Sequence, residues 1–355
     1  MWLVAAGLAV GLAGGLGGCA TSYGMAEHDV VFSRYSPLSR NLEVARRALP
    51  PLTYRRIVQT LAARHEQLSE QAIDLAHEKY DVYVPPGPPP PEGYGLIVFI
   101  APWGEPTRPQ IWRAALDRHR MIFVAAQRSG NGENILDRRV PLALLGYANV
   151  HARYPINDQR VYLWGFSGGS RTAEIVELAY PDIFRGVVLN AGADPIDGRE
   201  GMYKPPAELF RAFQRARLVY ITGEQDADNL RQDDVSQASM REACVLDIQS
   251  EPARGLGHQT LDGVLLDRVL DTLEAPRAVD EARLAACNAQ VEREIAARVE
   301  QAAAAIDRGD LEAARKQILA IDARFGGVAA DALLQLDDRL AGQAQGAQRR
   351  PPAIP

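Results

Sequence analysis

The segment Arg160–Tyr180, RVYLWGFSGGSRTAEIVELAY, constrains the fold of this chain more than any other part of its sequence. An apolar run at Val161–Trp164 predicts a buried strand, and the residues after Gly169 have the apolar period of a helix. Between the two lies a Gly-x-Ser-x-Gly turn centred on Ser167. A strand, a tight glycine turn and a helix in this order are typical of a nucleophile elbow.

Each residue of this turn has an expected physical role. Gly165 and Gly169 leave room where the backbones of the strand and the helix approach each other. Ser167 should adopt a strained backbone conformation that lifts its hydroxyl clear of the sheet. The N–H of Gly168 would then lie at a helix N-terminus, where it can donate to a developing oxyanion. The alternative is an ordinary glycine-rich turn that happens to contain a serine.

The composition excludes several classes of function. The chain has 355 residues, of which 47% are hydrophobic and 24% charged, as in soluble proteins with one large domain and something smaller. A net charge of −6 without a basic cluster argues against nucleic-acid binding. The cysteines lack C-x-x-C spacing and the histidines lack H-E-x-x-H spacing. We therefore expect neither a metal nor another cofactor.

Residues 2–18 are all apolar or glycine, in a run that is short for a membrane span and typical of a signal peptide. The sequence that follows, LGGCA at 16–20, resembles a bacterial lipobox, which implies that Cys19 carries lipid. Ala20 implies, by the same resemblance, the periplasmic side of the outer membrane. A plain secretory signal or an uncut N-terminal helix remains the alternative. We predict a signal peptide at 1–18 and a tether at 19–37.

Residues 38–275 should form one α/β domain. After two helices at 38–49 and 53–65 and a strand or hairpin arm within 73–84, apolar runs alternate with helical patterns. The predicted strands of this part are 96–100, 121–126, 161–164, 187–190, 218–222 and 245–250. Helices between strands imply a doubly wound, mostly parallel sheet. Sites on such sheets lie beyond the carboxyl ends of the strands, and Ser167 directly follows one.

After Pro276 the sequence is rich in alanine and charge and has no strand pattern, which predicts a small all-helical extension at 276–340. It is faintly similar to a tetratricopeptide-type pair, and an accessory helical hairpin packed on the domain is the alternative. These helices are a candidate surface for a protein partner. Residues 341–355 lack an apolar period and are predicted to be disordered.

A serine hydroxyl needs a base, and His258 is the one histidine that follows Ser167 in the chain. It lies in a loop, RGLGHQ, between the last predicted strand and a helix. An acid must orient the imidazole, and Asp226, after the strand at 218–222, is the first candidate. Asp228 is the next, and Asp194, after the preceding strand, is a structural alternative. A surface histidine and a helix-capping aspartate are the simpler interpretations.

The oxyanion hole should combine the N–H of Gly168 with one from the loop after the strand at 96–100. That loop reads Ala-Pro-Trp-Gly-Glu at 101–105, and Trp103 is the donor expected by position. Trp103, Trp112 and Phe166 could line a pocket for an apolar or aromatic acyl group, or they could equally belong to the core.

Five segments together resemble the α/β-hydrolase superfamily, and most closely its polyhydroxyalkanoate-depolymerase and feruloyl-esterase-like group. They are YDVYVPPG, LIVFIAPWGE, GFSGGSRTA, ITGEQDADN and GLGH, spread over roughly residues 75–275. The resemblance implies an α/β-hydrolase fold and a serine esterase with a Ser167–Asp226–His258 triad. The chain departs from the pattern at Trp103–Gly104, where many members of that group have His-Gly.

Two functions follow as hypotheses. The first is a lipid-anchored serine hydrolase that cleaves a small-molecule or polymeric carboxylic ester through an acyl-enzyme, and peptidase or thioesterase action stays open within it. The second is a weakly active or inactive lipoprotein of the same fold, which acts as a scaffold in the cell envelope.

The two remaining cysteines, Cys244 and Cys287, are expected at the same end of the domain. In an oxidising compartment they could form a disulfide that ties the helical extension to the domain and stabilises it by roughly 3–4 kcal/mol. Two buried, unpaired thiols are the alternative.

Overall fold

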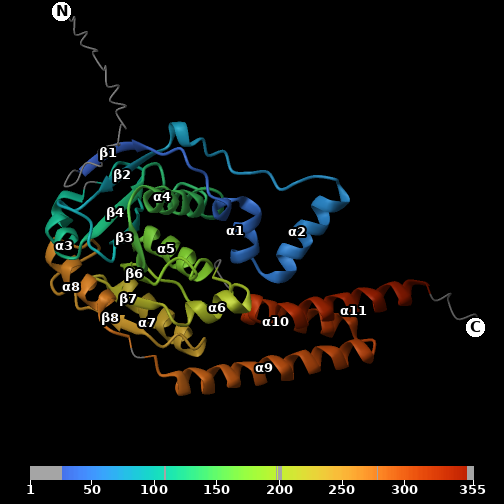
Figure 1. Ribbon diagram of the computed structural model, residues 1–355. Helices are drawn as coiled ribbons and strands as arrows, with labels where there is room; N and C mark the ends of the chain where they lie inside the picture. Colours follow the sequence, from blue (N-terminus) through green and yellow to red (C-terminus); the bar gives the residue numbers. More distant parts are fainter. Residues whose placement is uncertain (1–25, 108, 197, 199–201, 278, 350–355) are drawn as a thin grey trace, which may run out of the picture.

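Eight strands form one sheet with helices on both faces (Figure 1). The computed structural model describes residues 26–107, 109–196, 198, 202–277 and 279–349. The strands are β1 Ala26–Val31, β2 Lys79–Tyr83, β3 Tyr94–Ile100, β4 Met121–Ala126, β5 Ile156–Phe166, β6 Gly186–Asn190, β7 Arg217–Ile221 and β8 Ile248–Ser250. Their order across the sheet is β1-β2-β4-β3-β5-β6-β7-β8.

The strand directions confirm the predicted doubly wound sheet. The strand β2 is antiparallel to both of its neighbours, β1 and β4, whereas every pairing from β4 to β8 is parallel. Parallel neighbours require crossover connections, and helices supply them throughout this part of the sheet. The carboxyl ends of β3 to β8 therefore meet at one edge, which is where Ser167 lies.

Two groups of helices sandwich the sheet. One face is covered by α1 Asn41–Ala48, α4 Val140–Arg153, α5 Gly168–Ala179, α6 Ala207–Phe213 and α7 Ala227–Glu242. The other face is covered by α3 Arg113–Arg118 and α8 Gly263–Glu274. Short turns of helix are η1 Pro37–Ser39, η2 Leu75–His77, η3 Pro109–Trp112, η4 Ile135–Arg139 and η5 Gly326–Ala329.

The sheet core is apolar on both faces because the central strands read as continuous apolar runs. All seven residues of β3 are buried. On the face under α3, the indole of Trp164 packs edge-on against that of Trp112, with ring centroids 4.7 Å apart, and Phe99 and Phe123 complete the cluster. Trp112 also donates from its indole N–H to the carbonyl of Leu261 at 2.7 Å. Trp112 is thus a core residue and lines no acyl pocket.

The predicted tether at 19–37 is wrong for its second half. Residues 26–31 form the edge strand β1, which pairs with β2. Phe32 is buried behind it, with its ring 4.7 Å from that of Tyr80. The predicted signal peptide at 1–18 and the lipidation site Cys19 lie outside the described residues.

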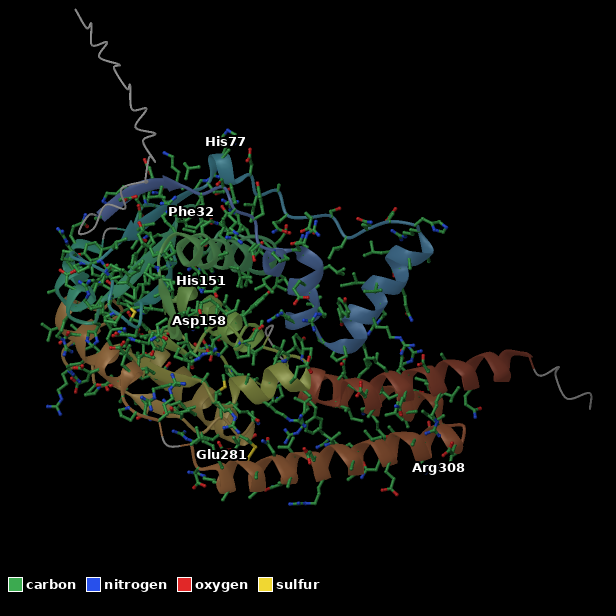
Figure 2. All side chains as sticks on the ribbon, in the orientation of Figure 1. Phe32, His77, His151, Asp158, Glu281 and Arg308 are labelled. Carbon is green, nitrogen blue, oxygen red and sulfur yellow. A yellow bond between two sulfur atoms is a disulfide. The ribbon has the colours of Figure 1, made fainter. Side chains whose placement is uncertain are left out.

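The C-terminal extension consists of α9 Glu281–Asp307, α10 Leu311–Phe325 and α11 Ala330–Arg349. The labels of Glu281 and Arg308 in Figure 2 mark the two ends of α9. The three helices share an apolar core, which Leu52 of α2 Pro51–Ala63 joins from the other domain. None of the described helices has the length and apolar run needed to cross a bilayer.

The predicted disorder of 341–355 is wrong for residues 341–349, which continue α11. Six of these nine residues are alanine or glutamine, which favour a helix even without an apolar stripe, and the two glycines among them do not end it. In this segment the intrinsic preference for helix outweighs the missing apolar period.

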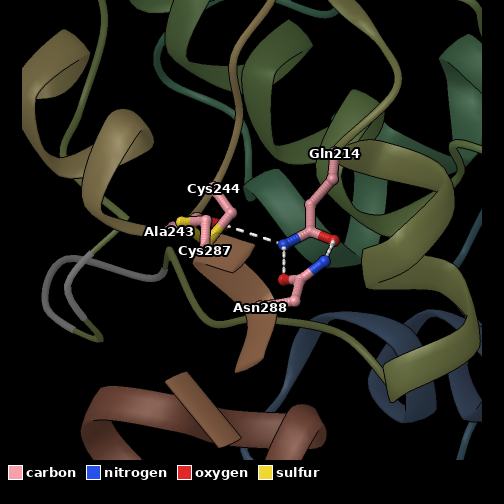
Figure 3. Close-up of a disulfide and its surroundings, with 5 residues drawn as sticks. All are labelled: Gln214, Ala243, Cys244, Cys287 and Asn288. Carbon is pink, nitrogen blue, oxygen red and sulfur yellow. Dashed lines mark hydrogen bonds between the residues drawn. A yellow bond between two sulfur atoms is a disulfide. The ribbon is translucent and has the colours of Figure 1, made fainter. Parts of the chain in front are cut away.

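A disulfide joins the two parts of the chain (Figure 3). Cys244 follows α7 and Cys287 lies in α9, with their Cα atoms 5.8 Å apart. Beside the bond, the side-chain amides of Gln214 and Asn288 form a reciprocal pair, with distances of 2.7 and 3.1 Å between nitrogen and oxygen. Gln214 also donates to the carbonyl of Ala243 at 3.0 Å. Covalent and polar contacts thus fasten α9 to the domain at one place.

We expect Cys244→Ser to lower the free energy of unfolding by about 4 kcal/mol, because the bond closes a loop of 43 residues in the unfolded chain. Urea denaturation of the oxidised protein, the variant and the Cys244→Ser/Cys287→Ser double variant measures the change. The double variant should have the same free energy of unfolding as Cys244→Ser, since the single substitution already removes the bond. A wild-type midpoint unaffected by reductant would contradict the prediction.

Candidate active site

The turn between β5 and α5 has the geometry that its sequence predicts. Ser167 has φ 53° and ψ −123°, a strained conformation for a residue with a side chain. Its N–H donates to the carbonyl of Asn190 at 2.8 Å, which ties the turn to β6. A Cβ atom on Gly165 would collide with the backbone of Gly169, and one on Gly169 would collide with the carbonyl of Ile100. Only glycine fits at either position, as predicted.

A chain of hydrogen bonds runs from Ser167 through His258 to Asp226. The Nε2 atom of His258 is 2.9 Å from the Oγ of Ser167, and its Nδ1 is 2.6 Å from the Oδ2 of Asp226. The carboxylate is largely buried, whereas the imidazole is 45% exposed and accessible to a ligand. The structure therefore brings together the three side chains that the sequence nominates. With Nδ1–H donated to Asp226, Nε2 is free to accept the proton of the serine.

The loops that carry the histidine and the aspartate are joined by their backbones. The N–H of Gln225 donates to the carbonyl of Leu256 at 2.9 Å, and that of Glu224 to the carbonyl of Ala253 at 3.2 Å. The Glu224 carboxylate in turn accepts from the N–H of Gly255 at 3.2 Å. These bonds extend the β7–β8 pairing beyond the ends of the strands. They fix His258 and Asp226 relative to each other.

The other two acid candidates lie elsewhere. Asp194 accepts from Arg171 and Gln232, each at 3.0 Å. Asp228 is almost fully exposed and pairs with Arg231. Asp226 occupies the N-cap position of α7, yet its side chain makes no cap hydrogen bond. Its carboxylate is directed at His258, which is 2.6 Å away.

Asn229 is a further member of this network that the sequence analysis did not predict. Its side-chain nitrogen lies 3.0 and 2.9 Å from the two carboxylate oxygens of Asp226 and 3.2 Å from the Nδ1 of His258. Burial alone would raise the pKa of Asp226, but the hydrogen bonds from His258 and Asn229 outweigh it and lower that pKa below its usual value. The signal for Asn229 was its place three residues after Asp226, one turn along the same helix.

Two backbone N–H groups, in the segments that follow β3 and β5, are the candidate donors to an oxyanion. Gly168 is the first residue of α5, so its N–H has no partner within the helix. Trp103 lies in the loop after β3. Within the described residues, neither N–H donates to another protein group. Both therefore suit the donor role that the sequence predicts for them.

Aromatic rings border the site. The ring of Phe166 is 5.0 Å from the imidazole of His258 and 6.1 Å from the indole of Trp103, measured between centroids. Phe166 is buried, and Trp103 is partly exposed. Trp103 thus presents apolar surface next to Phe166, the residue that precedes Ser167.

One cluster of possible metal ligands lies far from this site. His119, Asp267 and Asp271 come together between α3 and α8, at the opposite end of the strands. Arg118 already pairs with both carboxylates, at 2.6 Å for Asp271. The Nδ1 of His119 is 2.6 Å from Glu274. The cluster is an ion-pair network, and we assign no metal to it.

The helix that follows the elbow buries a carboxylate without a partner. Within the described residues, neither oxygen of Glu177 has a hydrogen bond. Burial raises its pKa to about 8, against the smaller effects of Arg277 and Arg185. The folded state therefore binds this proton more tightly than the unfolded state, and the stability from this site falls as pH rises from about 4.5 to 8.

We expect Glu177→Gln to gain stability relative to the wild type as pH rises from 5 to 9, because glutamine has no proton to lose. The gain should approach about 1.4 kcal/mol per unit of pKa shift. Thermal unfolding across this pH range measures it, with Glu312→Gln on the exposed face of α10 as the matched control. Parallel curves for wild type and Glu177→Gln would refute the assignment.

The strand order and the elbow together decide the fold. It is the α/β-hydrolase fold. In the α/β-hydrolase fold, the second strand runs against the others and a strained serine follows the fifth strand. Both features are present here, in β2 and in Ser167 after β5.

No protein-family model and no curated protein matches the chain. Three solved structures illustrate its similarities. A poly(3-hydroxybutyrate) depolymerase from Bordetella parapertussis is 16% identical with a TM-score of 0.42, over 59% of this chain and 88% of that one. A ferulic acid esterase is 16% identical with a TM-score of 0.41, over 54% and 89%. A thermostable esterase is 17% identical with a TM-score of 0.37, over 50% of this chain and about half, 51%, of that one.

Proposed function

We propose that this chain is a serine hydrolase that cleaves a carboxylic ester through an acyl-enzyme intermediate. One observation carries the proposal: Ser167, on a strained elbow, is linked by hydrogen bonds to His258 and through it to Asp226. A scaffold protein would need neither the strain nor the alignment, since strained residues persist where function requires them.

Each residue has one role in the proposed reaction. The Oγ of Ser167 bonds to the ester carbonyl carbon while its proton passes to the Nε2 of His258. The negative charge on the carbonyl oxygen is stabilised by the N–H groups of Gly168 and Trp103. His258 then protonates the departing alkoxide, and the same steps with water release the acid. Asp226 keeps the imidazole in the productive tautomer and stabilises its cation.

The substrate class follows from the surroundings of Ser167. The exposed imidazole supports access for large esters as well as small ones. The partly exposed Trp103, next to Phe166, supports an apolar or aromatic group beside the scissile bond. We therefore propose a small-molecule or polymeric carboxylic ester, hydrolysed without a metal or other cofactor.

A fluorophosphonate probe tests this function, because it reacts only with an activated serine. The wild-type protein is labelled, digested and analysed by mass spectrometry, with heat-denatured protein as control. We expect the label on the peptide that contains Ser167, and none after denaturation. Absence of label would favour the inactive scaffold instead, and label only on another residue would exclude Ser167 as the nucleophile.

We also propose that Cys19 is lipidated and holds the protein at the periplasmic side of the outer membrane. The small-residue sequence around Cys19, after an apolar run, supports lipidation. The Cys244–Cys287 bond supports an oxidising compartment. Globomycin, which blocks lipoprotein processing, should leave an unprocessed precursor, and Cys19→Ser should release the protein from membranes. Unchanged migration and membrane association in both cases would exclude the anchor.

A further inference from the structure

Arg139 is a buried arginine without a carboxylate partner. It lies in η4, immediately before α4, and only 2% of its surface is exposed. No ion pair to it exists among the described residues, and burial lowers its pKa to about 10. A buried charge is costly unless hydrogen bonds satisfy it. The hydrogen bonds that satisfy the Arg139 guanidinium therefore indicate the role of this residue.

The Arg139 guanidinium donates to the carbonyls of three separate segments. Its Nε is 2.9 Å from the oxygen of Ser129, its Nη2 is 3.0 Å from that of Ala101, and its Nη1 is 3.2 Å from that of Gly168. These residues belong to the loop after β4, the end of β3 and the first turn of α5. The last two segments carry Trp103 and Gly168. One planar side chain thus joins the two halves of the proposed oxyanion hole.

Backbone hydrogen bonds also fix the orientation of the peptide groups that contain the N–H of Trp103 and the N–H of Gly168. The carbonyl of Pro102 accepts from the N–H of Asn131 at 2.9 Å. The N–H of Trp103 belongs to the same planar peptide and so points the opposite way. In the same manner, the carbonyl of Ser167 accepts from Ser170 at 2.9 Å, which directs the N–H of Gly168 outward.

The loop after β4 is fitted closely to the loop after β3. The N–H of Arg128 donates to the carbonyl of Gly104 at 2.9 Å. A Cβ on Gly130 would lie 2.8 Å from both the nitrogen of Gly104 and the carbonyl carbon of Trp103. This contact leaves the loop that carries Trp103 little room to shift, provided that the loop after β4 is itself held in place. The bond from Arg139 to Ser129 holds it.

We propose that Arg139 is a positioning residue that sets the separation of the two oxyanion donors, Gly168 and Trp103. This inference rests on the proposed function. Arg139 touches no reacting atom and acts through the carbonyls of Ala101, Ser129 and Gly168. Lysine keeps the charge but has a single nitrogen, so it cannot reproduce three bonds in one plane.

Kinetics of Arg139→Lys and Arg139→Met test the proposal, with a p-nitrophenyl ester as substrate. Misplaced donors weaken binding of the transition state more than binding of the ester, so kcat should fall on the order of 100-fold while KM changes little. The rate of inactivation by a fluorophosphonate should fall in parallel. Guanidinium at sub-denaturing concentration should restore part of the activity of Arg139→Ala.

Arg217→Lys is the matched control. Arg217 is also buried and bonds to the carbonyls of Thr272 and Ala275, but at the opposite end of the strands, and it pairs with Asp247. The Arg217→Lys protein should be less thermally stable than the wild type and should have the same kcat. Hydrogen exchange should accelerate in the peptide at 101–105 of Arg139→Lys and stay unchanged there in Arg217→Lys.

The possible outcomes distinguish a failure of the role proposed for Arg139 from a failure of the proposed hydrolase function. If the wild type neither hydrolyses esters nor labels at Ser167, the proposed function fails, and the role of Arg139 falls with it. If the wild type is active and folded Arg139→Lys keeps kcat within about threefold, only the inference is overturned. Equal losses of kcat in Arg139→Lys and Arg217→Lys, unchanged exchange at 101–105, or failure of all three Arg139 variants to fold would overturn it too.

Discussion

Replacing Ser167 with alanine should lower kcat for a p-nitrophenyl ester by roughly 10⁴-fold or more. The variant keeps the backbone of the elbow but has no oxygen to form the acyl-enzyme. Any residual rate would come from the donors at Gly168 and Trp103 acting on water. Initial-rate kinetics with purified protein measure the loss, and thermal unfolding shows that the fold is intact.

Ser170→Ala is the control for this prediction. Ser170 is buried in the first turn of the same helix, and its hydroxyl bonds to the carbonyl of Gly192 at 2.5 Å, away from His258. We expect it to alter stability and leave kcat within the same order of magnitude. Full activity in Ser167→Ala would end the proposal of serine catalysis.

Asp226→Asn should lower kcat by about 10³–10⁴-fold. An asparagine amide can donate to the Nδ1 of His258, which would leave the proton on Nε2 and prevent that atom from accepting one from Ser167. The structure supplies two matched controls with the same substitution, Asp194→Asn and Asp228→Asn. Asp228 is exposed and outside the network, so its variant should behave as the wild type.

Asp194→Asn separates a structural effect from a catalytic one. Asp194 is paired with Arg171, so we expect its loss to affect thermal stability more than kcat. The assignment of the acid would be wrong if Asp226→Asn turned over normally while Asp194→Asn lost most of its activity. Intermediate losses in both would indicate that the network through Asn229 and Gln232 works as a unit.

The sheet and the elbow were predictable because each depends on a local pattern. The apolar runs of the central strands are continuous, and Gly165, Ser167 and Gly169 lie at spacings that only a tight strand–helix turn requires. His258 needed no long-range information either, since no other histidine follows Ser167 in the chain. In these cases the physical requirement and the residue that meets it lie close together in the sequence.

The edge strand β1 escaped prediction because its stability comes from its partner. Its sequence, AEHDVV, is half polar, and Asp29 has a φ of 58° where the register with β2 shifts. The sequence of β1 therefore lacks the alternation of apolar and polar residues that predicts a strand. The strand forms because β2 offers an unpaired edge, information that lies some fifty residues away along the chain.

Arg139 and Asn229 were missed for a similar reason. Arg139 precedes an apolar helix, and Asn229 lies in the first turn of another helix. Both are common residues at such positions, so the sequence alone gives no sign of a special role. Their roles arise from carbonyls and carboxylates on other loops, which only the folded chain brings within reach. Sequence patterns nominate the reacting groups more readily than the groups that hold them.

The disulfide has a topological consequence for the proposed base. Cys244 and Cys287 precede and follow β8, the His258 loop and α8, so the histidine lies inside a covalent ring. A ring restricts the open conformations of the segment it encloses, and local opening of that segment is disfavoured by entropy. Ser167 and Asp226 lie outside the ring. Reduction should therefore let His258 fluctuate more than Ser167 and Asp226, so we expect the redox state of this bond to affect how long the hydrogen-bonded arrangement of the three residues persists.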